Sequence, residues 1–166
     1  MAEKLEPFET NSGPGRKRNS CKAVVIKEGK ILLTANRDHL GDFYLLPGGG
    51  QQFGETARET VKREVLEETG WLVKPEELVL SRDYIGANHE FAHEEGDVHQ
   101  TELIFSALPL DYRGEAAVPD PWQTGIKWVE PEELKELRLY PAVLKGILPE
   151  LAEGSYSGPI YLGDVN

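Results

Sequence analysis

The stretch Gly48-Gly-Gly-Gln-Gln-Phe-Gly-Glu-Thr-Ala-Arg-Glu-Thr-Val-Lys-Arg-Glu-Val-Leu-Glu-Glu-Thr-Gly-Trp71 decides which fold we expect for this chain. Its spacing predicts a helix over residues 56–69. Thr56, followed three residues later by Glu59, forms a capping box at the start of this helix. Gly70 is a typical stop signal after the last helical turn. A capped helix directly preceded by a glycine-rich segment is therefore the element from which the remaining sequence is interpreted.

Three glutamates of this helix share one face. At ~100° per residue, Glu67 lies about 60° to one side of Glu64, and Glu68 lies about 40° to the other side. Like charges at these spacings destabilise a bare helix by ~0.2–0.5 kcal/mol per pair. Val61 and Val65 lie on an overlapping stripe, where carboxylates are costly unless they are paired or bound to a metal. A hard divalent cation is the natural partner of such oxygens, and an ordinary acidic surface helix is the alternative.

A run of three glycines, Gly48, Gly49 and Gly50, separates Pro47 from this helix. Glycines allow sharp turns and let the backbone approach a ligand closely. A glycine triplet alone is more often a turn than a binding site. Because this one lies just upstream of three clustered carboxylates, we interpret it as part of a diphosphate site. In such a site a metal bridges the anionic protein and the anionic substrate.

The spacing of residues across the stretch resembles the Nudix box in full. Gly49 is followed, after five residues, by Glu55, and the next matching group, after seven more, is Arg63-Glu64-Val65. Glu67-Glu68 and Gly70-Trp71 complete the pattern. Every fixed position is filled, and such a combination at set gaps rarely arises by chance.

The resemblance implies an α/β fold, a Nudix-type α/β/α sandwich around a mixed β-sheet, over residues 19–150. The remaining sequence suits a layered fold of this kind. We expect strands at 21–27, 30–34, 43–46, 78–84, 100–108 and 124–129, and helices at 131–137 and 141–148, the second bent or ended by Pro149. Residues 1–18 are expected to form a flexible leader. Residues 151–166 would then be a C-terminal tail with a short strand at 160–162, paired within the subunit or across a dimer.

For the site, the resemblance implies a hydrolase that cleaves a nucleoside diphosphate linked to another moiety, with Mg²⁺ or Mn²⁺ as cofactor. The implied catalytic group is Glu64, Glu67, Arg63 and Glu55, and the implied metal ligands are Glu64, Glu67, Glu68 and the backbone carbonyl of Gly48. Within it, Glu64 is our choice for deprotonating the attacking water, and Arg63 and Glu55 would shape the loop and helix. The metal would lower the pKa of its bound water and stabilise charge on the transferred phosphorus group.

One departure from the family pattern concerns the general base. Many Nudix proteins carry a carboxylate shortly before the strand that we predict at 124–129, whereas this chain has Gln123 there, and an amide cannot act as a base. Residues 90–97 carry four carboxylates, and an additional base could come from Glu94, Glu95 or Asp97. A solvated loop is the other interpretation of this acidic block. A transition-metal site using the neighbouring histidines is a weaker one, because hard cations prefer oxygen.

Substrate contacts are expected from four positions, Arg37, Tyr44, Gly49 and Gly50. Arg37 could donate to a phosphate, and a nucleobase could stack on Tyr44 or on Phe43, Phe91 or Trp122. Residues 86–89 carry neither the Pro that marks ADP-ribose hydrolases nor the Tyr that marks dinucleoside polyphosphate hydrolases. Nucleoside triphosphates, nucleotide sugars and ADP-ribose therefore stay open as substrates. The rival function is a catalytically silent Nudix domain that binds nucleotides as a regulator.

The composition excludes several classes of partner. The 166 residues include 18 Lys+Arg against 29 Asp+Glu, a net charge of −11. This acid excess argues against duplex nucleic acid, which is bound mainly through Lys and Arg. No apolar run approaches the ~20 residues of a membrane-spanning helix, and the single cysteine, Cys21, suits a reducing compartment. We therefore expect a cytoplasmic enzyme for a small molecule, with no membrane contact, that could form a homodimer.

Overall fold

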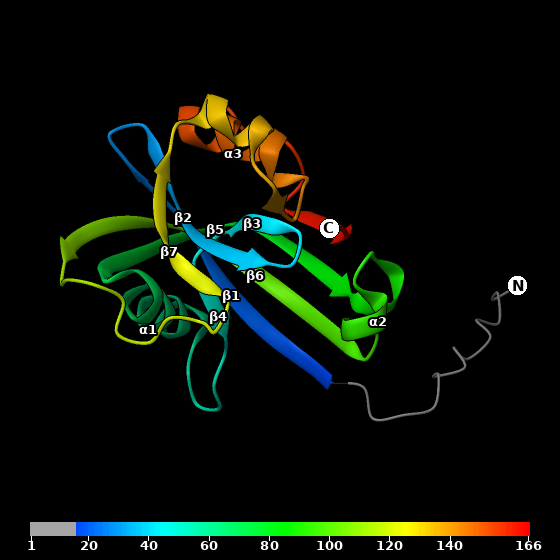
Figure 1. Cartoon of the computed structure of the whole chain (residues 1–166). Helices are drawn as coiled ribbons and strands as arrows, with labels where there is room; N and C mark the ends of the chain where they lie inside the picture. Colours follow the sequence, from blue (N-terminus) through cyan, green and yellow to red (C-terminus); the bar gives the residue numbers. More distant parts are fainter. Residues whose placement is uncertain (1–15) are drawn as a thin grey trace, which may run out of the picture.

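The computed structural model describes residues 16–166, which form a strongly curled β-sheet with helices on both sides (Figure 1). The strands are β1 (Arg16–Lys27), β2 (Lys30–Asp38), β3 (Gly41–Leu45), β4 (Gly48–Gly50), β5 (Trp71–Ile85), β6 (Val98–Tyr112), β7 (Gln123–Val129), β8 (Leu139–Tyr140) and β9 (Tyr161–Asp164). The helices are α1 (Ala57–Thr69), the short α2 (Ala92–Glu95) and α3 (Leu144–Glu153), with 3₁₀ segments η1 (Gly86–Asn88) and η2 (Pro131–Glu136). The expected α/β class is therefore confirmed.

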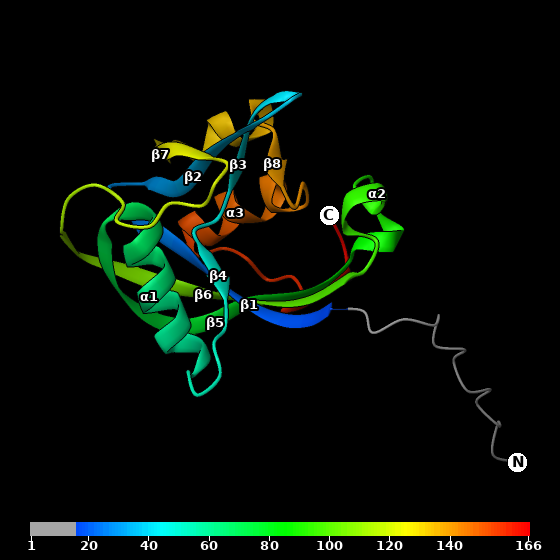
Figure 2. The ribbon, with the colours of Figure 1, turned by 60° about the horizontal axis from the view of Figure 1, so that its bottom comes forward.

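The strand β1 lies at the centre of the sheet. It pairs antiparallel with β2 and β4 and parallel with β6, so the sheet is mixed, as expected. The strand order is β8-β3-β2-β1-β6-β5-β9, with β4 attached to β1 and β7 attached to β2. The glycine triplet, expected to be a loop, is the short strand β4, with Gly49 opposite Cys21 of β1. This pairing holds the triplet beside α1 (Figure 2).

The two faces of β1 border different hydrophobic cores, because successive side chains of a strand point to opposite sides. Cys21, Ala23 and Val25 lie in the core that includes Val61 of α1. Val24 lies in the core that includes residues of α3. Figures 1 and 2 show α1 and α3 on opposite sides of the sheet. The predicted α/β/α sandwich is therefore confirmed.

The helix α1 begins and ends as the sequence predicts. The Thr56 side chain accepts a hydrogen bond from the Glu59 N–H, and the Glu59 side chain accepts one from the Thr56 N–H. At the other end, Gly70 adopts a left-handed conformation with φ of 74°, and its N–H donates to the Leu66 carbonyl. These caps fix which residues of α1 face the sheet, and with them the direction of its glutamates.

Two predictions for the C-terminal half were wrong in detail. Residues 131–136 form a 3₁₀ segment and not an α-helix. The helix α3 begins at Leu144 and continues past Pro149 to Glu153, although proline removes one hydrogen-bond donor from a helix interior. Leu144 and Leu148 of this helix are fully buried. Their burial is worth about 1.5–3 kcal/mol each and offsets the lost bond.

The boundaries of other elements also differ from the predictions. The strand β1 begins at Arg16, inside the segment expected to be a leader, and residues 1–15 of that leader lie outside the described part of the chain. The strand β5 begins at Trp71 and accommodates Pro75 beside an irregularity in its pairing with β6, where a missing N–H is tolerated. The predicted strand in the tail is present as β9, parallel to β5 of the same chain. Within residues 16–166, no helix has the length and apolar character needed to cross a membrane.

Candidate active site

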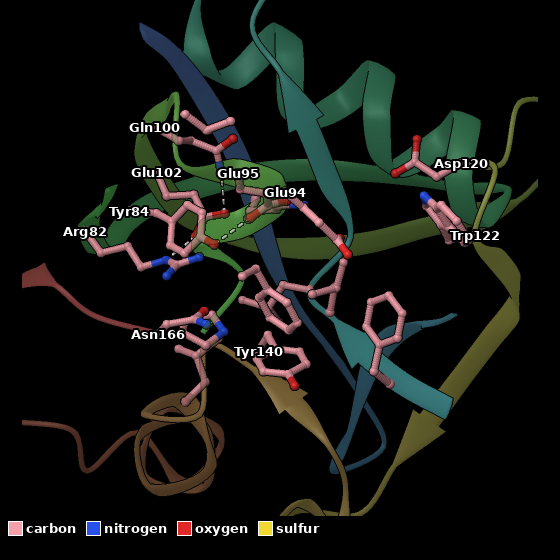
Figure 3. Close-up of a pocket in the computed structure, with 18 of the residues that line it drawn as sticks. Arg82, Tyr84, Glu94, Glu95, Gln100, Glu102, Asp120, Trp122, Tyr140 and Asn166 are labelled. Atoms are coloured by element: carbon pink, nitrogen blue, oxygen red, sulfur yellow. Dashed lines mark hydrogen bonds and ion pairs between the residues drawn. The ribbon is translucent and has the colours of Figure 1, made fainter. Parts of the chain in front are cut away.

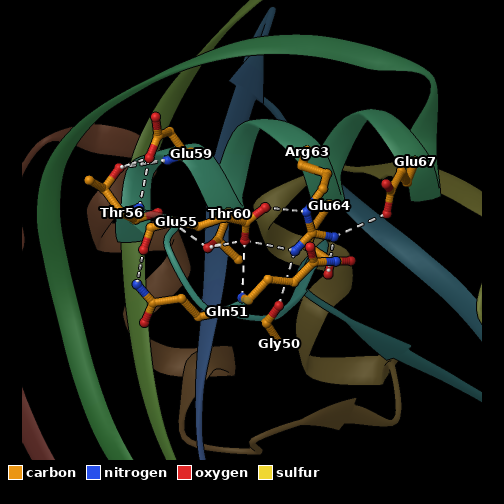
Figure 4. Close-up of polar contacts among 10 residues, drawn as sticks. Gly50, Gln51, Glu55, Thr56, Glu59, Thr60, Arg63, Glu64 and Glu67 are labelled. Atoms are coloured by element: carbon orange, nitrogen blue, oxygen red, sulfur yellow. Dashed lines mark hydrogen bonds and ion pairs between the residues drawn. The ribbon is translucent and has the colours of Figure 1, made fainter.

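Arg63 of α1 connects the carboxylates of the site (Figure 4). Its Nε donates to Glu55 Oε1 at 2.6 Å, and its Nη1 donates to Glu64 Oε1 at 2.7 Å and to Glu67 Oε2 at 3.2 Å. Its Nη2 donates to the Gly50 carbonyl at 3.1 Å. Hydrogen bonding from Arg63 lowers the pKa of Glu55 to about 2. The expected contact between Arg63 and Glu55 is therefore present, and it ties the start of α1 to β4.

Two glycines of β4 allow the close approach of this strand to its neighbours. Gly48 has a φ of +138°, and a Cβ there would lie 2.1 Å from the Cys21 carbonyl oxygen. A Cβ at Gly49 would lie 2.7 Å from the carboxylate of Glu64. Because neither residue carries a side chain, the glutamate face of α1 lies directly against the backbone of β4.

Glu68 is the buried carboxylate of the site, with only 4% of its surface exposed. Its Oε2 accepts a hydrogen bond from the Gly48 N–H at 2.9 Å. Burial raises its pKa to about 7, opposed by the positive charge of Lys22 and helped by the negative charge of Asp120. The Lys22 ammonium donates to the Gly48 carbonyl at 2.8 Å. The carbonyl that we expected to bind a metal therefore accepts a hydrogen bond from lysine here.

A divalent cation suits this donor set, although the side chains are not arranged around one. Among residues 16–166, no group of three or more His, Cys, Asp or Glu side chains is positioned to hold a metal ion. Glu64 and Glu67 instead contact Arg63. The donors are nevertheless all oxygens, and Glu68 is a buried carboxylate whose ionised form a nearby cation would stabilise. The residues present therefore fit a hard cation, which would compete with Arg63 for two of the carboxylates.

A cavity of about 600 Å³ adjoins this site (Figure 3). Lys22 and Asp120 line it, and the charges of both act on the pKa of Glu68, so they connect the cavity to the glutamate face. The basic side chains of the lining are Arg18, Lys22, Arg82 and Arg138. Five aromatic residues also line it: Phe43, Tyr84, Phe91, Trp122 and Tyr140. Five carboxylates, those of Asp38, Glu94, Glu95, Glu102 and Asp120, line it as well. The cations and rings among these groups suit a nucleotide, because phosphates pair with cations and bases stack on rings.

Not all of the predicted substrate contacts lie in this cavity. Phe43 lines it, whereas its neighbour Tyr44 packs against the core beneath α3 and is not a lining residue. Adjacent residues of a strand point to opposite faces, so of these two expected stacking residues only Phe43 faces the cavity. Arg37 is exposed and pairs with Asp42 at 2.6 Å, and it is not a lining residue either.

The acidic block around α2 lies at another part of the cavity. Glu94 and Glu95 line it, but Figure 3 shows them across the cavity from Asp120 and α1. Glu95 accepts a hydrogen bond from the Tyr84 hydroxyl, and Asp97 is not a lining residue. The structure therefore does not bring these carboxylates together with the glutamates of α1.

Two residues of the site escaped the sequence analysis. Asp120, three positions before Gln123, lines the cavity, and its negative charge acts on Glu68. Gln123 has a structural role, because its Nε2 donates to the Glu68 carbonyl at 2.7 Å. Lys22 was missed because a lysine within a β-branched strand carries no local signal for a binding role. An acidic residue just before Pro-Trp was the available signal for Asp120.

The curled mixed sheet, the glycine strand and the glutamate helix together define a protein of the Nudix class. The chain belongs to this family, because the family model described as NUDIX domain matches residues 16–151. A curated relative, the nucleoside triphosphatase NudI of Salmonella agona, is 30% identical over 148 residues, which cover 80% of this chain and 99% of the relative. The assignment as a pyrophosphohydrolase of the Nudix type is confirmed at the level of the family.

Solved structures agree with the fold. A NUDIX hydrolase from Nitrosomonas europaea superposes with a TM-score of 0.67 at 22% identity, covering 85% of this chain and 93% of that chain. A MutT protein from Bacillus halodurans superposes with a TM-score of 0.58 at 26% identity, covering 88% of each chain. Both support the same arrangement of sheet and helices.

Proposed function

We propose that this protein hydrolyses a nucleoside diphosphate linked to another moiety, by attack of water on a phosphorus of the diphosphate, with Mg²⁺ or Mn²⁺ as cofactor. The observation that supports this most directly is the glutamate face of α1, packed against the glycine strand β4 and adjoining a cavity whose lining includes cations, carboxylates and aromatic rings. The net charge of −11 makes a bound cation the natural bridge to an anionic substrate.

In this proposal Glu64, Glu67 and Glu68 hold the metal. The metal, when bound, supplies an activated water and stabilises charge on phosphorus. Arg63 positions Glu64 and Glu67 through its hydrogen bonds, and its contact with the Gly50 carbonyl keeps β4 against α1. The Gly48 carbonyl accepts a hydrogen bond from Lys22, so Gly48 would join these ligands when the Lys22 ammonium moves away. We propose that Lys22 then contacts a phosphate of the substrate.

Two carboxylates, those of Glu64 and Asp120, are the main candidates for the general base. Glu64 was the first choice from the sequence, but its Oε1 already accepts a hydrogen bond from Arg63 Nη1 at 2.7 Å. Asp120 lines the cavity near Glu68 and has no arginine partner among the described residues. We therefore propose Asp120 as the base, ahead of Glu94, Glu95 and Asp97.

The substrate class that we propose first is a nucleoside triphosphate. The NudI relative, which carries the name nucleoside triphosphatase, aligns over 99% of its own length. The cavity of about 600 Å³ falls within the usual size of small-molecule sites. Nucleotide sugars and ADP-ribose come next.

The test is release of phosphate or pyrophosphate from a panel of nucleoside triphosphates, nucleotide sugars and ADP-ribose, with Mg²⁺, Mn²⁺ or EDTA. We expect turnover that requires the metal and that falls at least a hundredfold in Glu67→Gln. Glu132→Gln, which removes an exposed carboxylate from η2, is the matched control and should keep full activity. Tight nucleotide binding without turnover of any panel member would instead support the regulator.

The remaining proposals concern setting and assembly. Cys21 is free and buried, which is compatible with the proposed reducing cytoplasm. The edge of β5 is covered by β9 of the same chain. A homodimer would therefore not form by pairing of a second copy with this edge. Light scattering of the purified protein would decide between a monomer and a dimer.

A further inference from the structure

The segment 160–166, which includes β9, lies beyond the part of the chain that the family model matches. It runs along the edge of β5. The Ser81 N–H donates to the Ile160 carbonyl at 2.7 Å, and the Ile85 N–H donates to Asp164 Oδ1 at 3.0 Å. This segment is therefore a fixed part of the sheet in this chain.

Side chains anchor the same segment from two further directions. Asp164 accepts hydrogen bonds from Asn88 Nδ2 at 2.7 Å and pairs with His89 Nε2 at 2.6 Å. Arg82, which is itself buried, donates to the Val165 carbonyl. These contacts position the next residue, Asn166, in the wall of the cavity.

Asn166 contributes an unpaired donor to this cavity. Its side chain lines the cavity near Arg82 and Tyr140 (Figure 3). Its Nδ2 is buried and has no hydrogen-bond partner among the described residues. A buried amide N–H without an acceptor is unfavourable, and most such groups in native structures find a partner. A ligand atom that accepts a hydrogen bond would satisfy it.

The acceptors of Glu102 and Gln100 beside Asn166 each accept a hydrogen bond from another protein donor. Glu102 accepts from Arg82 Nε at 2.5 Å with one oxygen and from Gln100 Nε2 at 3.0 Å with the other. The side-chain oxygen of Gln100 accepts from Arg18 Nε at 2.6 Å. The Asn166 Nδ2 is therefore a donor left over at this end of the cavity, and it suits an acceptor on the ligand.

We propose that Asn166 is a specificity-determining residue that recognises a carbonyl oxygen on the nucleobase of the substrate. The inference rests on the proposed function and deepens it. The Tyr140 ring, in edge contact with Phe43 and Phe91, supplies the apolar surface for a base beside this donor. Uracil has a keto group where cytosine has an amino group, and guanine has one where adenine has an amino group. We therefore expect uracil to be preferred over cytosine and guanine over adenine.

The experiment compares kcat/KM for UTP, CTP, GTP and ATP in the wild type, Asn166→Ala, Asn166→Asp and Ser157→Ala. Ser157, an exposed residue shortly before β9, gives the matched control. We expect the wild type to prefer UTP over CTP, or GTP over ATP, by about tenfold. Asn166→Ala should abolish this preference through KM, with kcat and the urea midpoint of unfolding unchanged. Asn166→Asp, which replaces the donor with an acceptor, should favour the amino-bearing partner.

The outcomes separate this inference from the proposed function. If the wild type turns over nucleotides without a keto preference, or if Asn166→Ala keeps that preference, the inference is overturned and the hydrolase proposal stands. If no nucleotide is turned over, calorimetric titration of UTP and CTP into the wild type and Asn166→Ala decides the inference alone. A keto preference in binding that is lost in Asn166→Ala supports it, and equal affinities overturn it.

Discussion

Replacing Glu68 with glutamine should stabilise the metal-free protein at alkaline pH while removing its activity. Burial raises the pKa of Glu68 from an ordinary 4.5 to about 7. At about 1.4 kcal/mol per pKa unit, ionisation of this carboxyl costs the folded state about 3 kcal/mol. The folded state keeps the proton to higher pH than the unfolded state does. The contribution of Glu68 to stability is therefore complete below about pH 4.5 and is lost as the pH rises through about 7.

The measurement is urea unfolding at pH 5 and pH 8 with EDTA, followed by the fluorescence of the three tryptophans. Glu68→Gln should match the wild type at pH 5 within about 1 kcal/mol and exceed it by up to about 3 kcal/mol at pH 8. Glu132→Gln, which also removes one negative charge, should show no such difference between the two pH values. Addition of Mg²⁺ at pH 8 should raise the midpoint of the wild type more than that of Glu68→Gln.

The reasoning would be refuted if Glu68→Gln were equally or less stable than the wild type at pH 8 while folding normally at pH 5. That result would mean that the hydrogen bond from the Gly48 N–H and the charge of Lys22 fully compensate the burial of the carboxylate. Glu68 would then be a satisfied structural residue, and the fit of this site to a cation would lose its main support.

Three further substitutions test how α1 and β4 are held together. Arg63→Lys keeps the charge but cannot form the forked contacts to Glu55 and Glu64, so kcat should fall at least tenfold in steady-state assays; an unchanged kcat would remove Arg63 from the site. Gly49→Ala places a Cβ at 2.7 Å from the Glu64 carboxylate, so activity should fall while circular dichroism shows a folded protein. Thr56→Ala removes the capping box and should cost about 1 kcal/mol in urea unfolding, with activity retained at 25 °C.

Local sequence signals were sufficient for α1 because every determinant of that helix is local. The capping box at Thr56, the left-handed cap at Gly70 and the glutamate spacing all act within a few residues. The same holds for the β1–β2 turn, where Glu28 and Gly29 both have positive φ. Elements whose ends depend on tertiary packing were predicted less well. The helix α3 continues past Pro149 because its own residues Leu144 and Leu148 are buried against the sheet. A short stretch of sequence does not show that burial.

The site followed the same division. The family pattern located the glutamates and the contact between Arg63 and Glu55. It could not identify Asp120, because the position of that carboxylate depends on how the chain enters β7 and not on its distance from the box. The sequence pattern also could not separate Tyr44 from Phe43 as stacking residues, since both are aromatic and only the face of β3 distinguishes them. Asn166 lies beyond the family pattern altogether.

The net charge of −11 does not describe the cavity, because several basic residues are placed there. Four of them line the cavity, and two are neutralised there, Arg82 by Glu102 and Arg138 by Asp38. Lys22 instead donates to a backbone carbonyl, and Arg18 donates to an amide oxygen. Among the described residues neither of them forms a salt bridge, although the charge of Lys22 acts on Glu68, so both can contact an anionic ligand. Because phosphates require local positive charge and not a positive protein, an acidic chain with these two cations beside the glutamate face of α1 is compatible with the proposed nucleotide substrate.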